Sequence, residues 1–250
     1  MKNLGKAFAS LLLVGALSMV AAAETAAARY DRNIESQVSQ QLTKKKEFHN
    51  LQASVEDGIV TLTGRVDVYQ QKLDAAKKIR KMSKVQGVRN LIEVSSTAPD
   101  SELAAKIDRK LYYDRMGYDN VFNYVTVSVN DGVATLIGEV KEPVSRDSAV
   151  SLVNSISGVK EVVDNVKVAP TSNFDDDIRL RATRAIYGDT VLGRYASDPA
   201  LPIRILVNHG NLTLYGTVDS KMDKQIAGMK AGQVFGVFKV QNNLVVANQS

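Results

Sequence analysis

The sequence predicts an α+β protein built from three tandem αββαβ units, each with two helices packed on one face of a three-stranded mixed sheet. Two observations predict this fold. The pattern Gly-x-x-Thr-Leu-x-Gly-x-Val occurs three times, starting at Gly58, Gly132 and Gly210, so the copies lie 74 and 78 residues apart. Around each copy, stretches of alternating apolar residues are bracketed by stretches with the apolar spacing of amphipathic helices.

Residues 1–23 have the three parts of a secretory signal peptide. Lys2 and Lys6 precede the apolar stretch Leu11 to Val20, and Ala21 to Ala23 supplies the small residues that a signal peptidase requires. The apolar stretch has roughly half the length of a membrane-spanning helix, which favours a cleaved signal over a retained anchor. A second alanine triplet follows, so cleavage a few residues later is an alternative. The sequence therefore predicts export to the periplasm.

Each unit is expected to begin with an amphipathic helix, because apolar residues recur at every fourth position. The three stripes are Ile34, Val38 and Leu42, then Leu103, Ile107 and Leu111, and finally Ile178, Ala182 and Ile186. Ser101 and Asp175 are the expected N-caps of the second and third helices, because short polar side chains accept hydrogen bonds from the free N–H groups there.

A β-hairpin is expected next in each unit. The first strands carry apolar residues at alternate positions, namely Leu51, Ala53 and Val55, Val125, Val127 and Val129, and Ile203, Ile205 and Val207. Asp57-Gly58, Asp131-Gly132 and His209-Gly210 then form the turns, since glycine accepts a positive φ. In the second strands, Gly64, Gly138 and Gly216 lie on the apolar face, where a missing side chain lets another segment approach closely. We interpret them as contacts with alanines of the following helix, Ala75, Ala149 and Ala227.

The second helix of each unit is expected over Val68–Ser83, Glu142–Ile156 and Asp219–Gln233, with Pro143 suited to a first helical turn. A third strand follows. Gly158-Val159 and Gly236-Val237 introduce it, and an asparagine closes it, at Asn90, Asn165 and Asn243. The first unit departs from this pattern, because Lys84 replaces the glycine and one residue must be deleted to align Asn90. We expect the units at residues 29–97, 100–169 and 173–248, and call them repeats 1, 2 and 3.

This combination of motifs resembles the BON domain family over almost the whole chain after residue 23. The motif glycines that carry the resemblance are Gly58, Gly64, Gly132, Gly138, Gly158, Gly210, Gly216 and Gly236. The resemblance implies a periplasmic, stress-linked protein that binds phospholipid. It also leaves open a stress protein that responds to small cations.

The charge of the chain is unevenly distributed. Repeat 1 has 13 basic and 8 acidic residues, repeat 2 has 8 and 11, and the region from Thr171 to Ser250 has 9 and 7. Six cations of repeat 1 fall on its expected second helix: Lys72, Lys77, Lys78, Arg80, Lys81 and Lys84. An exposed basic helix face can hold an anionic membrane surface, although a solvated helix face is the simpler interpretation. Lys44, Lys45 and Lys46 add charge in a nearby loop.

No catalytic constellation is found. The chain has no cysteine, and its two histidines, His49 and His209, lack partners at motif spacing. The run Asp175-Asp176-Asp177 suits a helix N-terminus better than a calcium site, which needs six or more oxygen ligands. We therefore expect a protein that is not an enzyme, with no cofactor and no metal.

Aromatic residues concentrate in the two longer connections between the first helix and the first strand, at Tyr112, Tyr113, Tyr118, Phe122 and Tyr124, and at Tyr187 and Tyr195. Such residues are favoured at protein and membrane interfaces, but they can equally cover a small core. Our leading hypothesis is binding to an anionic phospholipid membrane surface in support of the envelope under osmotic stress. The alternative is a scaffold that binds an envelope protein. A nucleic-acid partner is not expected, because the net charge is modest.

Overall fold

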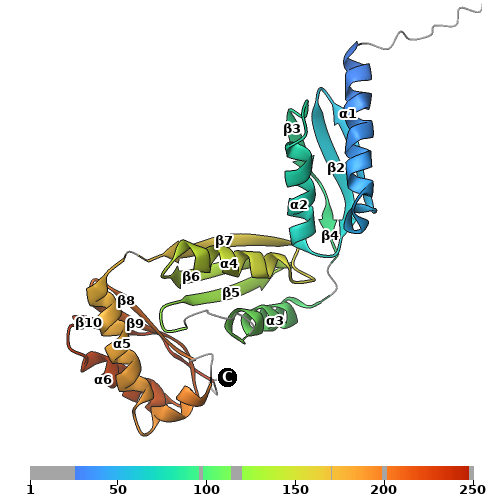
Figure 1. The fold of residues 1–250 in the computed structure, drawn as a ribbon. Coiled ribbons are helices and arrows are strands. Elements are labelled where there is room, and N and C mark those ends of the chain that lie inside the picture. The colour runs from blue at the N-terminus through green and yellow to red at the C-terminus, as the bar shows by residue number, and fades with distance from the viewer. Residues whose placement is uncertain (1–25, 96–97, 114–119, 170, 199–201, 248–250) are drawn as a thin grey trace, which may run out of the picture.

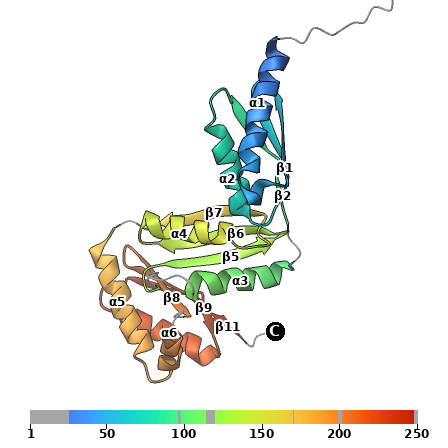
Figure 2. The same ribbon diagram turned by 45° about the vertical axis from the view of Figure 1, so that its right-hand side comes forward.

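The computed structural model describes residues 26–95, 98–113, 120–169, 171–198 and 202–247, so the predicted signal peptide lies outside the described residues. Within these ranges the α+β class and the repeated αββαβ order are confirmed. The three repeats follow one another in a bent row, with repeat 2 between repeats 1 and 3 (Figures 1 and 2). None of the helices in these ranges has both the length and the apolar character needed to cross a membrane.

Repeat 1 shows the order of elements that the other repeats share. It contains α1 (Ala26–Thr43), the short 3-10 helix η1 (Lys46–Phe48), β1 (Leu51–Glu56), β2 (Ile59–Val66), α2 (Tyr69–Arg80), β3 (Gly87–Asn90) and β4 (Glu93–Val94). β1 is antiparallel to β2, whereas β3 and β4 are parallel to it and form two pieces of one third strand. The α2 crossover makes this parallel pairing possible.

Repeats 2 and 3 repeat this topology. Repeat 2 contains α3 (Asp100–Tyr113), β5 (Tyr124–Asn130), β6 (Val133–Val140), α4 (Pro143–Asn154) and β7 (Glu161–Val168). Repeat 3 contains α5 (Asn173–Tyr187), η2 (Leu192–Ser197), β8 (Ile203–Asn208), β9 (Asn211–Val218), α6 (Lys221–Gly232), β10 (Lys239–Asn242) and β11 (Val245–Val246). The central strands and second helices start 74 and 78 residues apart, so residues from the hairpin onward correspond one to one.

Each repeat has a hydrophobic core of its own. The predicted stripes of the first helices are all buried, and so are the apolar residues of the central strands, such as Leu62, Leu136 and Leu214. The predicted alanines Ala75, Ala149 and Ala227 are fully buried as well. The alternation of apolar residues therefore identified the inward faces correctly.

The second-strand glycines do allow another backbone to approach closely, but the partner predicted above, an alanine of the following helix, is wrong. A Cβ at Gly138 would lie 2.0 Å from the carbonyl oxygen of Tyr124, and at Gly64 and Gly216 the nearest atoms are likewise backbone oxygens, of the residues directly before β1 and β8. The three glycines also have φ values of 109° to 145°, which other residues rarely adopt. They are needed for the close approach of the two hairpin strands and not for a helix contact.

The second helices are shorter than predicted, because α2 ends at Arg80 and not at Ser83. Lys84 therefore lies in the turn after the helix, with a φ of 75°. The equivalent residues, Gly158 and Gly236, have φ values of 100° and 94°. Repeat 1 thus keeps the same turn as its neighbours but places a lysine in the left-handed conformation, which costs roughly 1–2 kcal/mol.

Replacing Lys84 by glycine should therefore stabilise repeat 1 by about 1 kcal/mol, because glycine adopts this conformation without strain. Urea unfolding followed by circular dichroism measures the change. Ser83→Gly is the matched control, since Ser83 is not among the residues with positive φ; this control should be slightly destabilising. If Lys84→Gly and Ser83→Gly lower the midpoint equally, the turn is not strained.

A carboxylate of each first helix, three residues before its first buried apolar residue, holds the hairpin turn. Asp175 accepts hydrogen bonds from the backbone N–H groups of His209 and Gly210, at 2.9 and 2.8 Å. Asp31 and Asp100 make the same pair of bonds to the turns of repeats 1 and 2. The predicted N-caps were wrong: Ser172 caps α5, and Ser101 lies inside α3.

The residues that close the third strands were also misaligned. Asn90, Asp164 and Asn242 pair with the equivalent residues Leu62, Leu136 and Leu214, so no deletion is needed in repeat 1. The side-chain oxygen of each accepts a hydrogen bond from the N–H two residues later. The amides of Asn90 and Asn242 also donate to a carbonyl of the second helix. Asn165 and Asn243, proposed above, are each one position too late.

Candidate functional site

The six predicted cations of repeat 1 do not form one surface. Lys72 lies near the start of α2, half-buried, where it borders a hollow shared with Val133 and Lys160 of repeat 2. Lys78 is also half-buried and donates a hydrogen bond to the carbonyl of Gln41 in α1, at 3.3 Å. Lys78 is therefore engaged within repeat 1, and Lys72 lies at the boundary with repeat 2.

The other four are exposed at the end of α2 that points away from repeat 2 (Figure 1). We call Lys77, Arg80, Lys81 and Lys84 the basic α2 surface. Among the described residues, Lys77, Arg80 and Lys81 form no ion pair. The ammonium of Lys84 lies 5.7 Å from the centre of the Tyr30 ring, a cation–π distance. The surface is thus a group of cations whose charge is not neutralised by carboxylates of the described residues.

The basic α2 surface is a property of repeat 1 alone. The equivalent residues of repeat 2 are Ser151, Asn154, Ser155 and Gly158, and those of repeat 3 are Met229, Gly232, Gln233 and Gly236. The backbone is the same in all three repeats, so the fold does not require cations at these positions. Their presence in repeat 1 needs another explanation.

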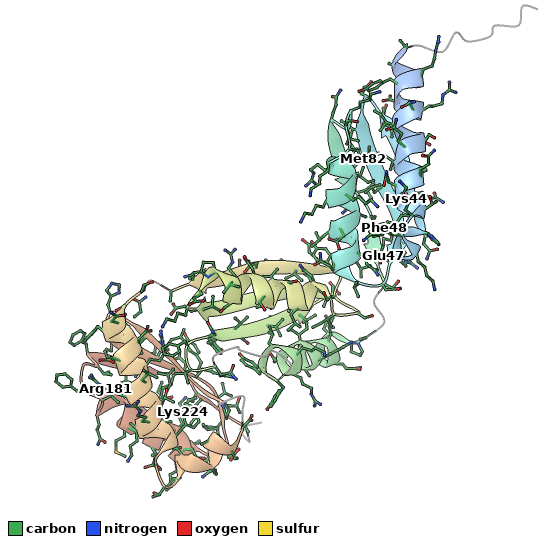
Figure 3. The ribbon with its side chains drawn as sticks, in the orientation of Figure 1. Lys44, Glu47, Phe48, Met82, Arg181 and Lys224 are labelled. Atoms are coloured by element: carbon green, nitrogen blue, oxygen red, sulfur yellow. The ribbon has the colours of Figure 1, made fainter. Side chains whose placement is uncertain are left out.

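The lysines of the connecting loop lie elsewhere. Lys44 and Glu47 lie towards the opposite end of repeat 1 from Met82, which follows Lys81 (Figure 3). Lys45 forms an ion pair with Glu47, with Nζ and Oε1 3.0 Å apart. The two basic segments that the sequence suggested as one cluster are therefore separate.

Most of the predicted aromatic residues lie in the junction between repeats 2 and 3. Tyr124 stacks on Tyr215, with ring centres 5.3 Å apart. The hydroxyl of Tyr113 donates to Asp198 at 2.8 Å, and Phe122 lies beside the ammonium of Lys141. Tyr118 lies outside the described residues. These side chains join two repeats and do not form an open docking surface.

Two buried arginines of repeat 3 complete this junction, and the sequence analysis missed both. Arg204 donates to the carbonyl of Asn120 at 3.1 Å and lies over the ring of Tyr112. Arg179 pairs with Asp176 at 2.8 Å and lies 3.8 Å from Glu139. Their positions look like ordinary outward-facing positions in the sequence, but both arginines contact repeat 2 in the structure.

Burial at this junction shifts two carboxyl groups. It raises the pKa of Asp108 to about 6. It also raises the pKa of Glu139, although the charge of Arg179 opposes this shift. A cavity of about 430 Å³ lies nearby, lined in part by Glu139, Lys141 and Arg179. Because its charged groups are already paired with one another, we do not assign a ligand to it.

The remaining polar candidates have structural roles. His209 lies in a hairpin turn with a φ of 50°, and His49 bonds to the carbonyl of Thr43 at 3.1 Å. Asp176 and Asp177 form ion pairs with Arg179 and Arg181. Over the described ranges, no group of three or more histidine, aspartate or glutamate side chains is placed to hold a metal ion.

Comparison with known proteins identifies one family three times in the chain. Residues 30–96, 99–170 and 189–248 each match the BON domain family. The third match begins after α5, although the buried residues of α5 belong to the core of repeat 3.

Two relatives are identical to this chain at about a quarter of the aligned residues. Osmotically-inducible protein Y of Escherichia coli (strain K12) is 26% identical over 161 residues, which cover 61% of this chain and 75% of the relative. A protein of Anaplasma centrale, described as an uncharacterized protein in the gshII 5' region, is 27% identical over 145 residues, 55% of this chain and 94% of its own length.

Among solved structures, CdsD aligns over most of the chain but superposes poorly. This structural protein of the type III secretion system of Chlamydia trachomatis aligns over 87% of the chain and 92% of its own, at 15% identity. The TM-score is 0.25, so the alignment carries no argument about function.

Proposed function

Because this chain belongs to the BON domain family, with three copies of the domain, we propose that it is an exported periplasmic protein that binds anionic phospholipid surfaces and supports the cell envelope under osmotic stress. It acts by binding and not by catalysis. The name of its relative, osmotically-inducible protein Y, supports the link to osmotic stress. The predicted signal peptide supports the location.

The observation that carries this proposal is the basic α2 surface. Its four exposed cations lie at the free end of repeat 1, where a flat, negatively charged surface can approach them without obstruction from repeat 2. Each cation near an anionic membrane contributes about 1 kcal/mol. Four of them together give an attachment that is reversible.

The distribution of charge sets the orientation of the bound protein. Repeat 1 has 13 basic and 8 acidic residues, whereas repeat 2 has 8 basic and 11 acidic residues. An anionic membrane therefore attracts the end of repeat 1 and repels repeat 2. This electrostatic contact should therefore be made by the end of repeat 1.

Replacing Lys77, Arg80 and Lys81 together by glutamine should weaken binding to anionic vesicles by roughly 2–3 kcal/mol, which is about 30- to 150-fold. These side chains are exposed and unpaired, so the fold should be unaffected. Co-sedimentation with vesicles of phosphatidylcholine and phosphatidylglycerol at low salt measures the change.

Lys44, Lys45 and Lys46 provide a matched control, because replacing them by glutamine removes the same charge from the other end of repeat 1. This variant should bind within a few-fold of the wild type. Equal weakening in both variants would mean that net charge alone matters. Undiminished binding by the Lys77, Arg80 and Lys81 variant would rule out the basic α2 surface as the site.

A further inference from the structure

Repeat 3 has no cation at any of the four positions equivalent to the basic α2 surface, and exposed apolar side chains lie in and beside the same part of the fold. Met229 stands where repeat 1 has Lys77, and it is 54% exposed. Beyond the end of α6, Phe235 and Phe238 stand where repeat 1 has Ser83 and Gln86. The same part of the fold is therefore cationic in one repeat and hydrophobic in another.

Phe235 and Phe238 are exposed to an unusual degree for phenylalanine, at 83% and 76%. Phe174, at the start of α5, is 48% exposed, and its ring centre lies 6.2 Å from that of Phe238. We call Phe174, Phe235 and Phe238 the aromatic tip. It surrounds the turn at Gly236, which has a φ of 94°. The most exposed ring, Phe235, thus projects from a turn, whereas Phe174 and Phe238 also line one side of the cavity of about 430 Å³ described above.

The fold does not require these phenylalanines. Repeat 2 has Ser157 and Lys160 at the two positions, and its turn has the same backbone conformation at Gly158. Exposed apolar area gathered at one place is unfavourable in water, and in natural proteins it marks a surface that binds something. The aromatic tip is therefore a binding feature that was added to a common scaffold.

The charges beside the aromatic tip indicate what it binds. The guanidinium of Arg181 lies 5.8 Å from the ring centre of Phe235, at the outer edge of repeat 3 (Figure 3). Lys239 is exposed next to Phe238. The neighbouring carboxylate of Asp177 pairs with Arg181 at 3.0 Å. Apolar rings on a projecting turn, with cations at their base, match the layered polarity of a membrane interface.

We propose that the aromatic tip inserts into the interfacial region of a lipid bilayer, with Arg181 and Lys239 at the level of the phosphate groups. This inference rests on the proposed function, and it adds a second kind of contact to it. The basic α2 surface attaches by charge, whereas the aromatic tip attaches by burying apolar area. The two contacts lie at opposite ends of the molecule (Figure 1).

The two contacts differ in their response to salt, so they can be measured separately. At ~1 M salt the Debye length is ~3 Å, and binding through exposed cations is largely screened. Burial of phenylalanine is not screened. Binding that persists at high salt should therefore depend on the aromatic tip alone.

A double variant takes its residues from repeat 1: Phe235→Ser and Phe238→Gln. Its vesicle binding at high salt should be at least about tenfold weaker than that of the wild type, because each buried phenylalanine contributes a large apolar area. It should keep the salt-sensitive part. A control variant, Val144→Ser with Val245→Ser, removes two side chains that are 65% and 63% exposed, and should bind like the wild type.

A fluorescent probe reports insertion directly, because the chain contains no tryptophan. In Phe235→Trp, emission should shift to the blue on adding phosphatidylcholine vesicles, and brominated lipids should quench it. Val144→Trp should do neither. An unshifted spectrum at position 235 would overturn the proposal whether or not the basic α2 surface binds. Concentration-dependent dimerisation that is lost in the double variant, without any shift, would assign the aromatic tip to a second copy of the chain.

Discussion

Replacing Gly138 by alanine is expected to unfold repeat 2. A Cβ there would overlap the carbonyl oxygen of Tyr124, at 2.0 Å, and the φ of 145° strains any residue that has a side chain. The strained backbone costs roughly 1–3 kcal/mol, and pushing apart two paired strands typically costs a further 1–3 kcal/mol. The total approaches the ~3–5 kcal/mol that a core of this size supplies.

Urea unfolding of the full chain and limited proteolysis measure this effect. Proteolysis should cut Gly138→Ala within repeat 2 while repeat 1 stays resistant. Gly232→Ala is the matched control, because a Cβ there would meet only Val240, at an ordinary 3.8 Å. It should leave stability the same or slightly higher, as expected for alanine at the end of a helix. A Gly138→Ala protein that unfolds like the control would show that the hairpin strands can separate at little cost.

Replacing Asp175 by alanine should destabilise repeat 3 by roughly 3–4 kcal/mol. Its carboxylate is 8% exposed and accepts from the N–H groups of His209 and Gly210. A hydrogen bond to a charged group contributes about 1.5–3 kcal/mol, and a buried donor without a partner carries a further penalty. The variant leaves both donors unpaired at the turn between β8 and β9.

Thermal unfolding of the variant measures the loss. Asp177→Ala is the control, because that side chain is 63% exposed and its ion pair with Arg181 lies on the surface; such pairs contribute at most about 1 kcal/mol. The unfolding midpoint of Asp175→Asn should fall between those of the two alanine variants. The asparagine side chain has a single carbonyl oxygen, so it can accept from only one of the two N–H groups, that of His209 or that of Gly210. Equal midpoints for Asp175→Ala and Asp177→Ala would mean that the turn does not depend on this carboxylate.

The architecture could be predicted from the sequence because it is repeated. Three copies of one hydrophobic pattern identify the same inward positions three times. The predicted burial of Leu62, Leu136 and Leu214 therefore rests on three consistent observations. Periodicity reports which side of an element is buried. It does not report which neighbour touches a given residue. Gly138 was therefore placed on the correct face but explained by the wrong contact.

Other details depend on contacts that are distant in sequence. Asp31, Asp100 and Asp175 each precede the first buried apolar residue of their helix by three positions, and this signal was present in the sequence. It could have suggested a shared role, but not that the partner is a hairpin turn up to 35 residues away. Strand register likewise decides that Asp164, and not Asn165, corresponds to Asn90.

The candidate site could be predicted only in part. Composition located the cations of repeat 1, but packing separates Lys72 and Lys78 from the four that are free to bind. The aromatic tip was missed because aromatic residues were sought in the longer connections. Aligning repeats 1 and 2 with repeat 3 over the turn after the second helix would have revealed Phe235 and Phe238 against serine, lysine and glutamine.

The binding of the wild-type chain to vesicles of increasing phosphatidylglycerol content tests the proposed function most directly. We expect co-sedimentation at low salt to rise steeply with the anionic fraction. Raising the salt to ~1 M, where the Debye length is ~3 Å, should remove this dependence on lipid charge and leave only weak binding. Binding that is absent at every lipid composition and salt concentration would contradict the assignment of this protein to the membrane surface.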